Sequence, residues 1–130
     1  MQLISKINSA GKAIHVAIYS FTHDEIAEAL INAKNRGLEV KVLMEKQQAG
    51  SEYSDDEKLA KAGIEVRFMD NSEGIMHNKF AIIDSGLVAT GSFNYSKNAD
   101  ESNNENLVFL ENAEAAQKFE AEFERLWEAS

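Results

Sequence analysis

Two pairs of polar residues near the middle of the chain have side chains that suit phosphoryl chemistry. Within residues 76–96, the sequence predicts two short strands on either side of a tight turn. His77 and Lys79 begin the first strand, and Ser92 and Asn94 end the second. Because side chains two positions apart in a strand share a face, we expect all four groups on one side of the hairpin if the chain is still extended at Ser92 and Asn94. An ammonium, a hydroxyl and a carboxamide there can bind the non-bridging oxygens of a phosphoryl group, with an imidazole beside the phosphorus atom.

Two other kinds of site would use some of the same residues. His77, Asp84 and Glu105 are metal-ligand types, but Lys79 beside them would repel a divalent cation. Asp84 also has the opposite strand parity, so it should point away and fix the hairpin. Ser92 with His77 resembles part of a serine hydrolase site, but the serine lacks the G-x-S-x-G turn that exposes such a nucleophile. We therefore expect phosphoryl chemistry without a metal or other cofactor.

The flanking sequence predicts helices and strands in alternation. The expected elements are a short helix near residues 3–7, a strand at 13–21, a helix at 23–36, a strand at 38–44, a short helix ending at Gly63, a strand at 64–69, hairpin strands at 77–84 and 87–91, a strand at 106–110 and a closing helix after Asn112. This order predicts an α/β layered domain, formed by residues 1–130 as a single unit, with a mixed, mostly parallel β-sheet flanked by helices.

Three helix starts carry a recognisable capping signal. Thr22 with Glu25, and Ser54 with Glu57, have the spacing of a capping box, in which two side chains satisfy free backbone donors. Asn112 is the expected cap of the closing helix.

Composition limits the class of protein. The 130 residues contain no cysteine, which excludes disulfides and thiolate metal sites, and no apolar run long enough to span a bilayer. Because no targeting leader is recognisable, we expect a cytoplasmic protein, or a periplasmic or secreted one if a leader has been removed. The net charge is −9, but nine acidic residues lie within 100–130. That segment is expected to present a solvated acidic face, which leaves room for a local cationic pocket elsewhere.

The spacing of the polar residues resembles a family signature. His77-x-Lys79, Asp84 and Gly91-Ser92-x-Asn94 match every fixed position of the HxKx4Dx6GSxN motif of the phospholipase D superfamily. Nearly the whole chain takes part in the resemblance. AIYSFTHDEIAEALINAKNRGLEVKVL is similar to the first strand, helix and second strand of the family, and SNNENLVF to the segment that supplies a downstream glutamate. A compact domain with one motif is most similar to the small bacterial endonuclease of this superfamily.

The resemblance implies a metal-independent mechanism with a phosphohistidine intermediate. His77 would attack phosphorus, a second histidine would protonate the leaving oxygen, and water would then release the phosphate. Lys79 and Asn94 would stabilise negative charge and Ser92 would support them, while Glu105 would hold His77 in the right tautomer. Because this chain carries one motif histidine, the resemblance implies a homodimer with the active site at its two-fold interface.

The substrate is less narrowly defined than the chemistry. A nuclease acting on DNA or RNA is the favoured function, because the one-motif resemblance points there. A phospholipase D or other small phosphodiesterase is the alternative, although no amphipathic segment for stable membrane insertion is evident. A catalytically idle dimeric scaffold is a third reading, disfavoured by the intact motif.

Four residues of the first strand and of the helix start that follows it are open to more than one reading. His15 is expected to be structural, and His23 to be a surface residue at a helix start that could instead line the site. Tyr19 and Phe21 are expected in the core, with a platform for a base or an acyl chain as the other reading.

Overall fold

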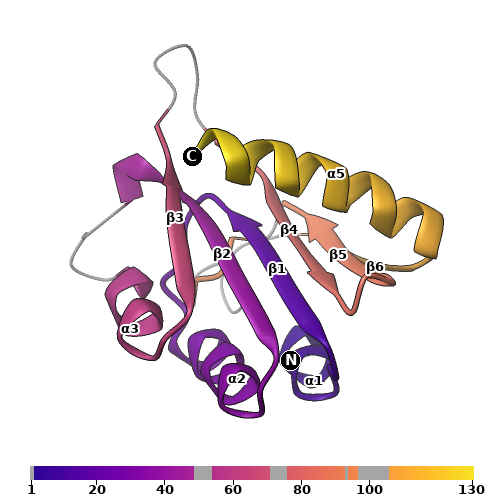
Figure 1. Cartoon of the computed structure of the whole chain (residues 1–130), viewed down its shortest axis with the longest axis horizontal. Coiled ribbons are helices and arrows are strands. Elements are labelled where there is room, and N and C mark those ends of the chain that lie inside the picture. The colour runs from indigo at the N-terminus through magenta and orange to yellow at the C-terminus, as the bar shows by residue number, and fades with distance from the viewer. Residues whose placement is uncertain (1, 49–53, 71–75, 93, 97–105) are drawn as a thin grey trace.

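The computed structural model describes residues 2–48, 54–70, 76–92, 94–96 and 106–130, which form helices around one β-sheet (Figure 1). The elements are α1 (Gln2–Asn8), β1 (Ala13–Ile18), α2 (Asp24–Asn35), β2 (Glu39–Glu45), the short 3-10 helix η1 (Lys46–Gln48), α3 (Asp56–Lys61), β3 (Glu65–Met69), β4 (Lys79–Ile83), β5 (Leu87–Gly91), β6 (Leu107–Glu111) and α5 (Ala113–Ala129). The predicted alternation of helices and strands is confirmed. Among the described helices, none combines the length and the hydrophobicity needed to cross a bilayer.

The sheet is mixed, as expected, with strand order β3-β2-β1-β4-β5-β6. The expectation that it is mostly parallel is wrong for the pairings, because two of the five neighbouring pairs are parallel and three are antiparallel. The parallel pairs join β1, β2 and β3, whose connections contain helices. β4 and β5 are joined by a tight turn, which forces an antiparallel pair, and β4 also runs antiparallel to β1.

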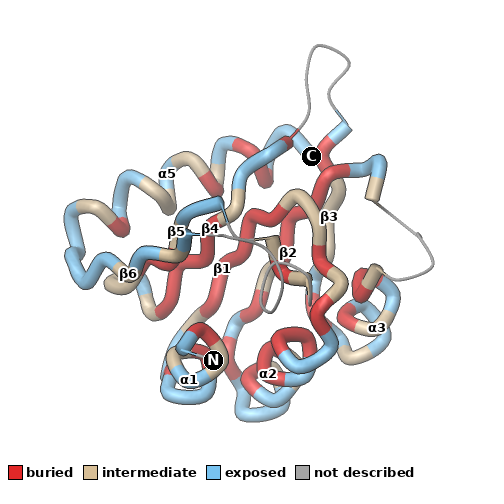
Figure 2. Tube along the Cα trace, turned by 180° about the vertical axis from the view of Figure 1, so that it is seen from behind, coloured by how far each residue is buried: buried red, intermediate tan, exposed pale blue. Residues whose placement is uncertain are grey.

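Each face of the sheet carries its own apolar cluster. Apolar residues of α1, α2 and α3 pack with one face, which includes Ile14, Val16 and Ile18 of β1. Apolar residues of α5, among them Phe123 and Trp127, pack with the other face. Figure 2 accordingly shows the central strands buried along most of their length, whereas the outer surfaces of the helices are exposed. The sheet is thus a middle layer, and its ends are where polar side chains can reach solvent.

Two predicted capping boxes are not formed. α2 begins at Asp24, and the backbone N–H of Thr22, which Glu25 would accept from in a capping box, donates instead to the carbonyl of Tyr95 at 2.6 Å. The cap is His23, whose Nδ1 accepts a hydrogen bond of 3.3 Å from the Ile26 N–H. α3 starts after Asp55 without a side-chain capping bond, so the Ser54 box is also wrong.

The cap predicted for α5 is confirmed. Asn112 Oδ1 accepts from the backbone N–H of Ala115 at 2.9 Å. An asparagine in extended conformation before the helix satisfies one of the free donors of the first turn.

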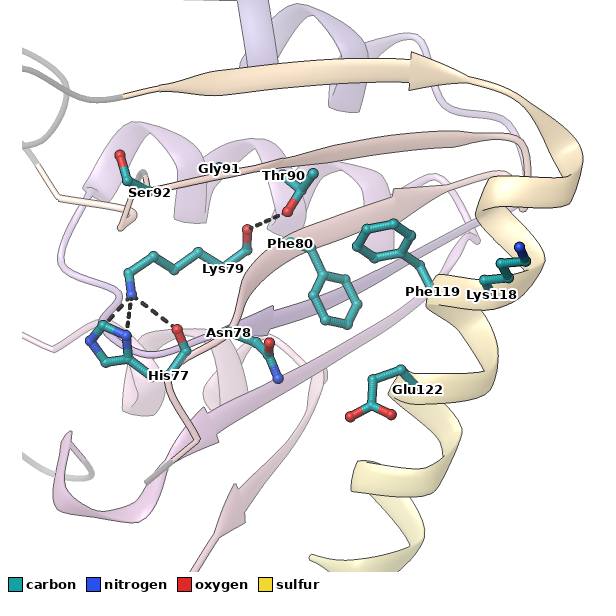
Figure 3. Close-up of a pocket in the computed structure, with 10 residues that line it drawn as sticks. All are labelled: His77, Asn78, Lys79, Phe80, Thr90, Gly91, Ser92, Lys118, Phe119 and Glu122. Carbon is teal, nitrogen blue, oxygen red and sulfur yellow. Dashed lines mark hydrogen bonds between the residues drawn. The ribbon is translucent and has the colours of Figure 1, made fainter. Parts of the chain in front are cut away.

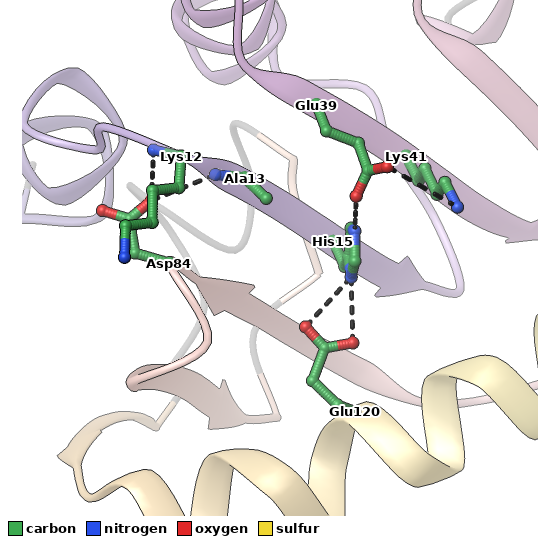
Figure 4. Close-up of polar contacts among 7 residues, drawn as sticks. All are labelled: Lys12, Ala13, His15, Glu39, Lys41, Asp84 and Glu120. Atoms are coloured by element: carbon green, nitrogen blue, oxygen red, sulfur yellow. Dashed lines mark hydrogen bonds and ion pairs between the residues drawn. The ribbon is translucent and has the colours of Figure 1, made fainter.

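Asp84 fixes the turn between β4 and β5, at the end of the hairpin opposite His77. Its carboxylate accepts hydrogen bonds from three backbone N–H groups, of Gly11, Lys12 and Ala13, at 2.9, 2.7 and 3.1 Å. Figure 4 shows the bonds from Lys12 and Ala13. Partial burial acts to raise the pKa of Asp84, but the three donors together lower it below its ordinary value. The prediction that Asp84 points away from the polar cluster and holds the hairpin in place agrees with these contacts.

Candidate active site

His77 and Lys79 lie against each other at the start of β4, as Figure 3 shows. The ammonium of Lys79 lies 2.9 Å from His77 Nδ1 and 3.3 Å from Nε2, and donates to the His77 carbonyl at 3.0 Å. His77 is exposed, so a substrate can reach the imidazole from solvent. An ammonium has no lone pair and must donate, so it competes for the same ring nitrogens that would act as a nucleophile.

Tyr19 forms one wall of this cluster. Its ring centroid is 4.7 Å from that of His77, and the Lys79 ammonium lies 5.7 Å from the centre of the Tyr19 ring. The backbone N–H of Tyr19 donates to the carbonyl of Asn78 at 3.0 Å, which ties the end of β1 to the start of β4. Tyr19 is therefore only partly buried and belongs to the site, whereas Phe21 is fully buried in the core. The core expectation is confirmed for Phe21 and is wrong for Tyr19, for which the platform role stays a prediction.

Ser92 lies just after β5, where two backbones approach closely. Its N–H donates to the Asn106 carbonyl, and its hydroxyl accepts from the Asn106 N–H, both at 3.0 Å. A Cβ on the preceding Gly91 would lie 1.9 Å from the Asn106 carbonyl oxygen. The glycine of the motif is therefore required by the close approach of the segment before β6, and this approach positions Ser92.

Asn94 is held at the same end of the sheet by the segment that follows β1. Its Oδ1 accepts from the backbone N–H of Ser20 at 3.2 Å, and the N–H of Tyr95 donates to the Ser20 carbonyl at 3.1 Å. With Oδ1 engaged by the backbone, the amide nitrogen of Asn94 is the group that can donate to an anion.

The sequence pattern suggested that the four motif side chains share one face of the hairpin, but in the structure they do not. Phe80 pairs with Thr90, and paired residues lie on the same face of the sheet. By the same register Ser92 lies on the face of Phe80, whereas Lys79 lies on the opposite face. β4 begins at Lys79 and β5 ends at Gly91, so the groups instead gather at one end of the sheet. The expectation was wrong because residue parity within each strand does not fix the register between them. Glu105, expected to orient His77, lies outside the described residues.

A pocket of about 580 Å³ opens beside these groups (Figure 3). It is lined by His77, Asn78, Lys79, Phe80, Thr90, Gly91, Ser92, Lys118, Phe119 and Glu122. The sequence pattern gave no sign that α5 forms part of this pocket. Phe119 meets Phe80 edge to face, with centroids 5.2 Å apart, and gives the pocket an aromatic wall. Phe119 belongs to the apolar residues of α5 that recur at helical spacing, but this spacing does not indicate which strand the helix covers.

Glu122 places a carboxylate on the rim of this pocket. Hydrogen bonds from Arg125, at 2.6 and 3.0 Å, hold the pKa of Glu122 below its ordinary value, so the carboxylate stays ionised near neutral pH. An anionic substrate would therefore be repelled at the Glu122 rim and attracted at the Lys79 end.

The other two histidines lie away from this pocket. His23 is fully buried beneath the first turn of α2, so neither the surface position nor the pocket position expected for it is correct. His15 is buried on β1 and paired with carboxylates, which agrees with the structural role expected for it. Among the described residues of one chain, the pocket lining therefore includes His77 as its single imidazole.

Comparison with known proteins identifies relatives over almost the whole chain. The family model described as "Cardiolipin synthase, PLD-like domain" matches residues 3–127. A mitochondrial cardiolipin hydrolase from Chlamydomonas reinhardtii is 33% identical over 127 residues, which are 98% of this chain and 56% of the relative. A phospholipase D from Rickettsia bellii is 38% identical over 117 residues, which are 90% of this chain and 58% of the relative. The chain thus spans somewhat more than half the length of these curated relatives.

Two solved structures have nearly the same fold. Nuc from Salmonella typhimurium, described as a phospholipase D family member, superposes with a TM-score of 0.92 at 34% identity. NucT from Helicobacter pylori superposes with a TM-score of 0.91, also at 34% identity. In both cases the match covers 98% of this chain and 86% of the solved chain.

Proposed function

The chain belongs to the phospholipase D-like family of phosphodiesterases, and we propose that it is a metal-independent nuclease that forms a phosphohistidine on His77. One observation carries the proposal: the Lys79 ammonium lies 2.9 Å from the exposed His77 imidazole, at the mouth of a pocket. A nucleophile beside a fixed cation, both open to solvent, is suited to attack on an anionic phosphodiester.

The proposed reaction begins when a phosphodiester replaces the contact between Lys79 and the imidazole. Lys79 then donates to the non-bridging oxygens, which leaves a ring nitrogen of His77 with its lone pair directed at phosphorus. As the N–P bond forms, the bond from phosphorus to the leaving oxygen breaks, and that oxygen takes a proton from a second imidazole. Water deprotonated by the same imidazole attacks phosphorus, the N–P bond breaks, and His77 is regenerated.

The remaining motif residues would act on the same charge. The Asn94 amide and the Lys79 ammonium would stabilise the five-coordinate phosphorus, and Ser92 would hold the Asn106 backbone at the edge of the site. Glu105 is proposed to orient His77. The second imidazole is proposed to be His77 of a second copy of this chain, so that the site is complete in a homodimer.

Nucleic acid is proposed as the substrate because the resemblance to single-motif family members points there. The similarity to Nuc and NucT extends over 86% of each of those chains, whereas it covers little more than half of the curated relatives. An aromatic wall beside the site, formed by Phe80 and Phe119, also offers a surface for a base.

A phospholipase is the second candidate, and a separate observation favours it. Several relatives that are 31–38% identical are named mitochondrial cardiolipin hydrolase or phospholipase D. The same aromatic wall would accept part of an acyl chain.

Hydrolysis of bis(p-nitrophenyl) phosphate in excess EDTA tests the chemistry. We expect turnover by the wild type and none above background for His77→Ala, with unchanged circular dichroism. Lys61→Ala, which changes an exposed lysine on α3 outside the pocket lining, is the control for substitution away from the site and should retain full activity. Turnover that requires a divalent cation would contradict the mechanism, and no turnover at all would favour a scaffold.

Plasmid DNA, single-stranded RNA and cardiolipin vesicles, given to the same preparation, test the substrate. Cleavage of nucleic acid without release of phosphatidic acid supports the nuclease. The opposite pattern would replace it with the phospholipase while leaving the His77 chemistry in place.

A further inference from the structure

His15, in the central strand β1, is held between two carboxylates from different elements (Figure 4). Its Nδ1 lies 3.0 and 2.9 Å from the two oxygens of Glu120 on α5, and its Nε2 lies 2.7 Å from Glu39 Oε2 at the start of β2. The ring also stacks on Phe123, with centroids 4.9 Å apart and planes inclined by 11°. The imidazole is therefore fixed in position and orientation, yet the proposed reaction makes no use of it.

Glu124 completes a set of metal-ligand side chains at this point. Glu120 and Glu124 are one helical turn apart, so they share the face of α5 that meets the sheet. One ligand atom from each of His15, Glu120 and Glu124 can be chosen so that all lie within 4.8 Å of one another. In a tetrahedral zinc site, with bonds of about 2.1 Å, neighbouring ligand atoms are about 3.4 Å apart. The ligand atoms would therefore have to move about 1.4 Å closer together when an ion binds.

We propose that His15, Glu120 and Glu124 bind a divalent cation of the zinc type and thereby fasten α5 to the sheet. One imidazole nitrogen and two carboxylate oxygens are a ligand set that suits Zn²⁺, with water in the fourth position. The bond from Nδ1 to the ion takes the place of the contact between Nδ1 and Glu120, and any proton held between them passes to solvent.

Glu39 supports this assignment from the far side of the ring. When Nε2–H donates to Glu39, the lone pair of the imidazole is on Nδ1, which faces Glu120 and Glu124. Proteins commonly orient a metal-binding histidine in this way, with a carboxylate on the nitrogen that does not bind the metal. The arrangement also places three carboxylates around one ring, which favours a cation.

The proposed ion site is accessible to solvent and separate from the phosphodiester site. The Glu120 side chain keeps 22% of its surface exposed, so an ion can enter from the α5 side. His15 pairs with Ile82 of β4, whereas Lys79 pairs with Ile18. Three residues along a strand are about 10 Å. The ion would thus be structural, and its loss need not stop the chemistry at His77.

Isothermal titration of EDTA-treated, dialysed protein with ZnCl₂ at pH 7.5 tests the proposal. We expect one ion per chain with micromolar affinity, and a rise in Tm of about 5 °C at saturation. Glu124→Gln, which leaves the His15–Glu120 contact in place, should weaken binding at least tenfold and remove the rise in Tm. Glu120→Gln should do the same.

Two controls separate this site from other zinc-binding groups. Glu128→Gln alters an exposed carboxylate of the same helix and should bind Zn²⁺ as the wild type does. His77→Ala should also retain the binding, because the active-site imidazole is not a ligand. Wild-type affinity in both Glu124→Gln and Glu120→Gln, or no uptake at 100 µM Zn²⁺ by the wild type, would overturn the proposal and leave the nuclease proposal unaffected.

Discussion

The contact between His77 and Lys79 is the smallest unit on which the chemistry depends. An ammonium 2.9 Å from Nδ1 keeps positive charge where a phosphoryl group must lie, and the Tyr19 ring limits where either side chain can move. Charge stabilisation by a fixed donor is commonly worth two to three powers of ten in rate.

Replacing Lys79 with alanine should lower kcat about 10²- to 10³-fold, because the negative charge on phosphorus loses its nearest cation. Steady-state kinetics with a phosphodiester substrate measure the change, and thermal melting checks that the variant folds. A kcat within twofold of the wild type would show that Lys79 does not act on the transition state.

Asp55 is expected to make the protein less stable as pH rises toward neutrality. Burial, and then the neighbouring Asp24 carboxylate, raise the pKa of Asp55 from 3.8 to about 7. The unfolded chain ionises near pH 4 while the folded protein keeps its proton up to about pH 7, so stability falls across that interval.

Asp55→Asn should therefore unfold with a free energy about 1 to 2 kcal/mol higher than the wild type at pH 8, after allowance for solvent screening, and with little difference at pH 4. Urea denaturation at both pH values measures this. Glu57→Gln, an exposed acid in the first turn of the same helix, is the control and should show no such pH dependence.

At the scale of elements, the β4–β5 hairpin is fixed at one end by Asp84 and shaped at the other by Gly91. Asp84 has φ 55° and connects the turn to the start of β1 through three backbone donors. Because Gly91 has no side chain, the backbone just before β6 can occupy the space where a Cβ would lie. Asp84 and Gly91 are both fixed positions of the motif, and these contacts explain on structural grounds why each residue is needed.

Asp84→Asn should destabilise the fold by about 1 to 3 kcal/mol, because charged acceptors make stronger bonds to backbone donors than amides do. Asparagine tolerates the positive φ, so the loss reflects the charge. Since the pKa of Asp84 is lowered on folding, its contribution is present above about pH 4 and disappears as pH falls further. Denaturant melts at pH 7 and pH 3 check both statements. A variant that melts like the wild type yet is inactive would instead place Asp84 in the chemistry.

Gly91→Ala should cost more than 2 kcal/mol, because the new methyl group would lie 1.9 Å from the Asn106 carbonyl oxygen and β6 would have to shift. Ser92 would move with it, so activity should fall as well. Gly11→Ala is the matched control, since a Cβ there meets nothing within 4 Å, and it should melt within about 1 °C of the wild type. Equal melting temperatures for the two variants would contradict the role given to Gly91.

For the whole molecule, the proposed reaction needs two imidazoles, and His77 is the one in the described pocket of each chain. If two copies share a site, specific activity should fall on dilution below the dimer dissociation constant. Subunit exchange with excess His77→Ala should also suppress the activity of wild-type chains. Light scattering and mixing kinetics measure these effects. Full activity per wild-type chain at every mixing ratio would show that each chain works alone.

The sequence by itself determined the type and order of the elements and the identity of the motif residues. Alternating apolar residues indicated which segments are strands, and Asp84 was expected to hold the hairpin, as its three bonds to the backbone before and at the start of β1 show. These are local properties, because strand and helix periodicities can be read from neighbours in the chain.

Only the tertiary structure decided how the elements meet. It brought the motif groups together at the end of the sheet, placed Tyr19 beside His77 and Phe119 over the pocket, and set His15 between Glu39 and Glu120. Such contacts depend on the register between strands and on how α5 crosses the sheet. Both follow from packing between residues far apart in the chain, and no local spacing encodes them.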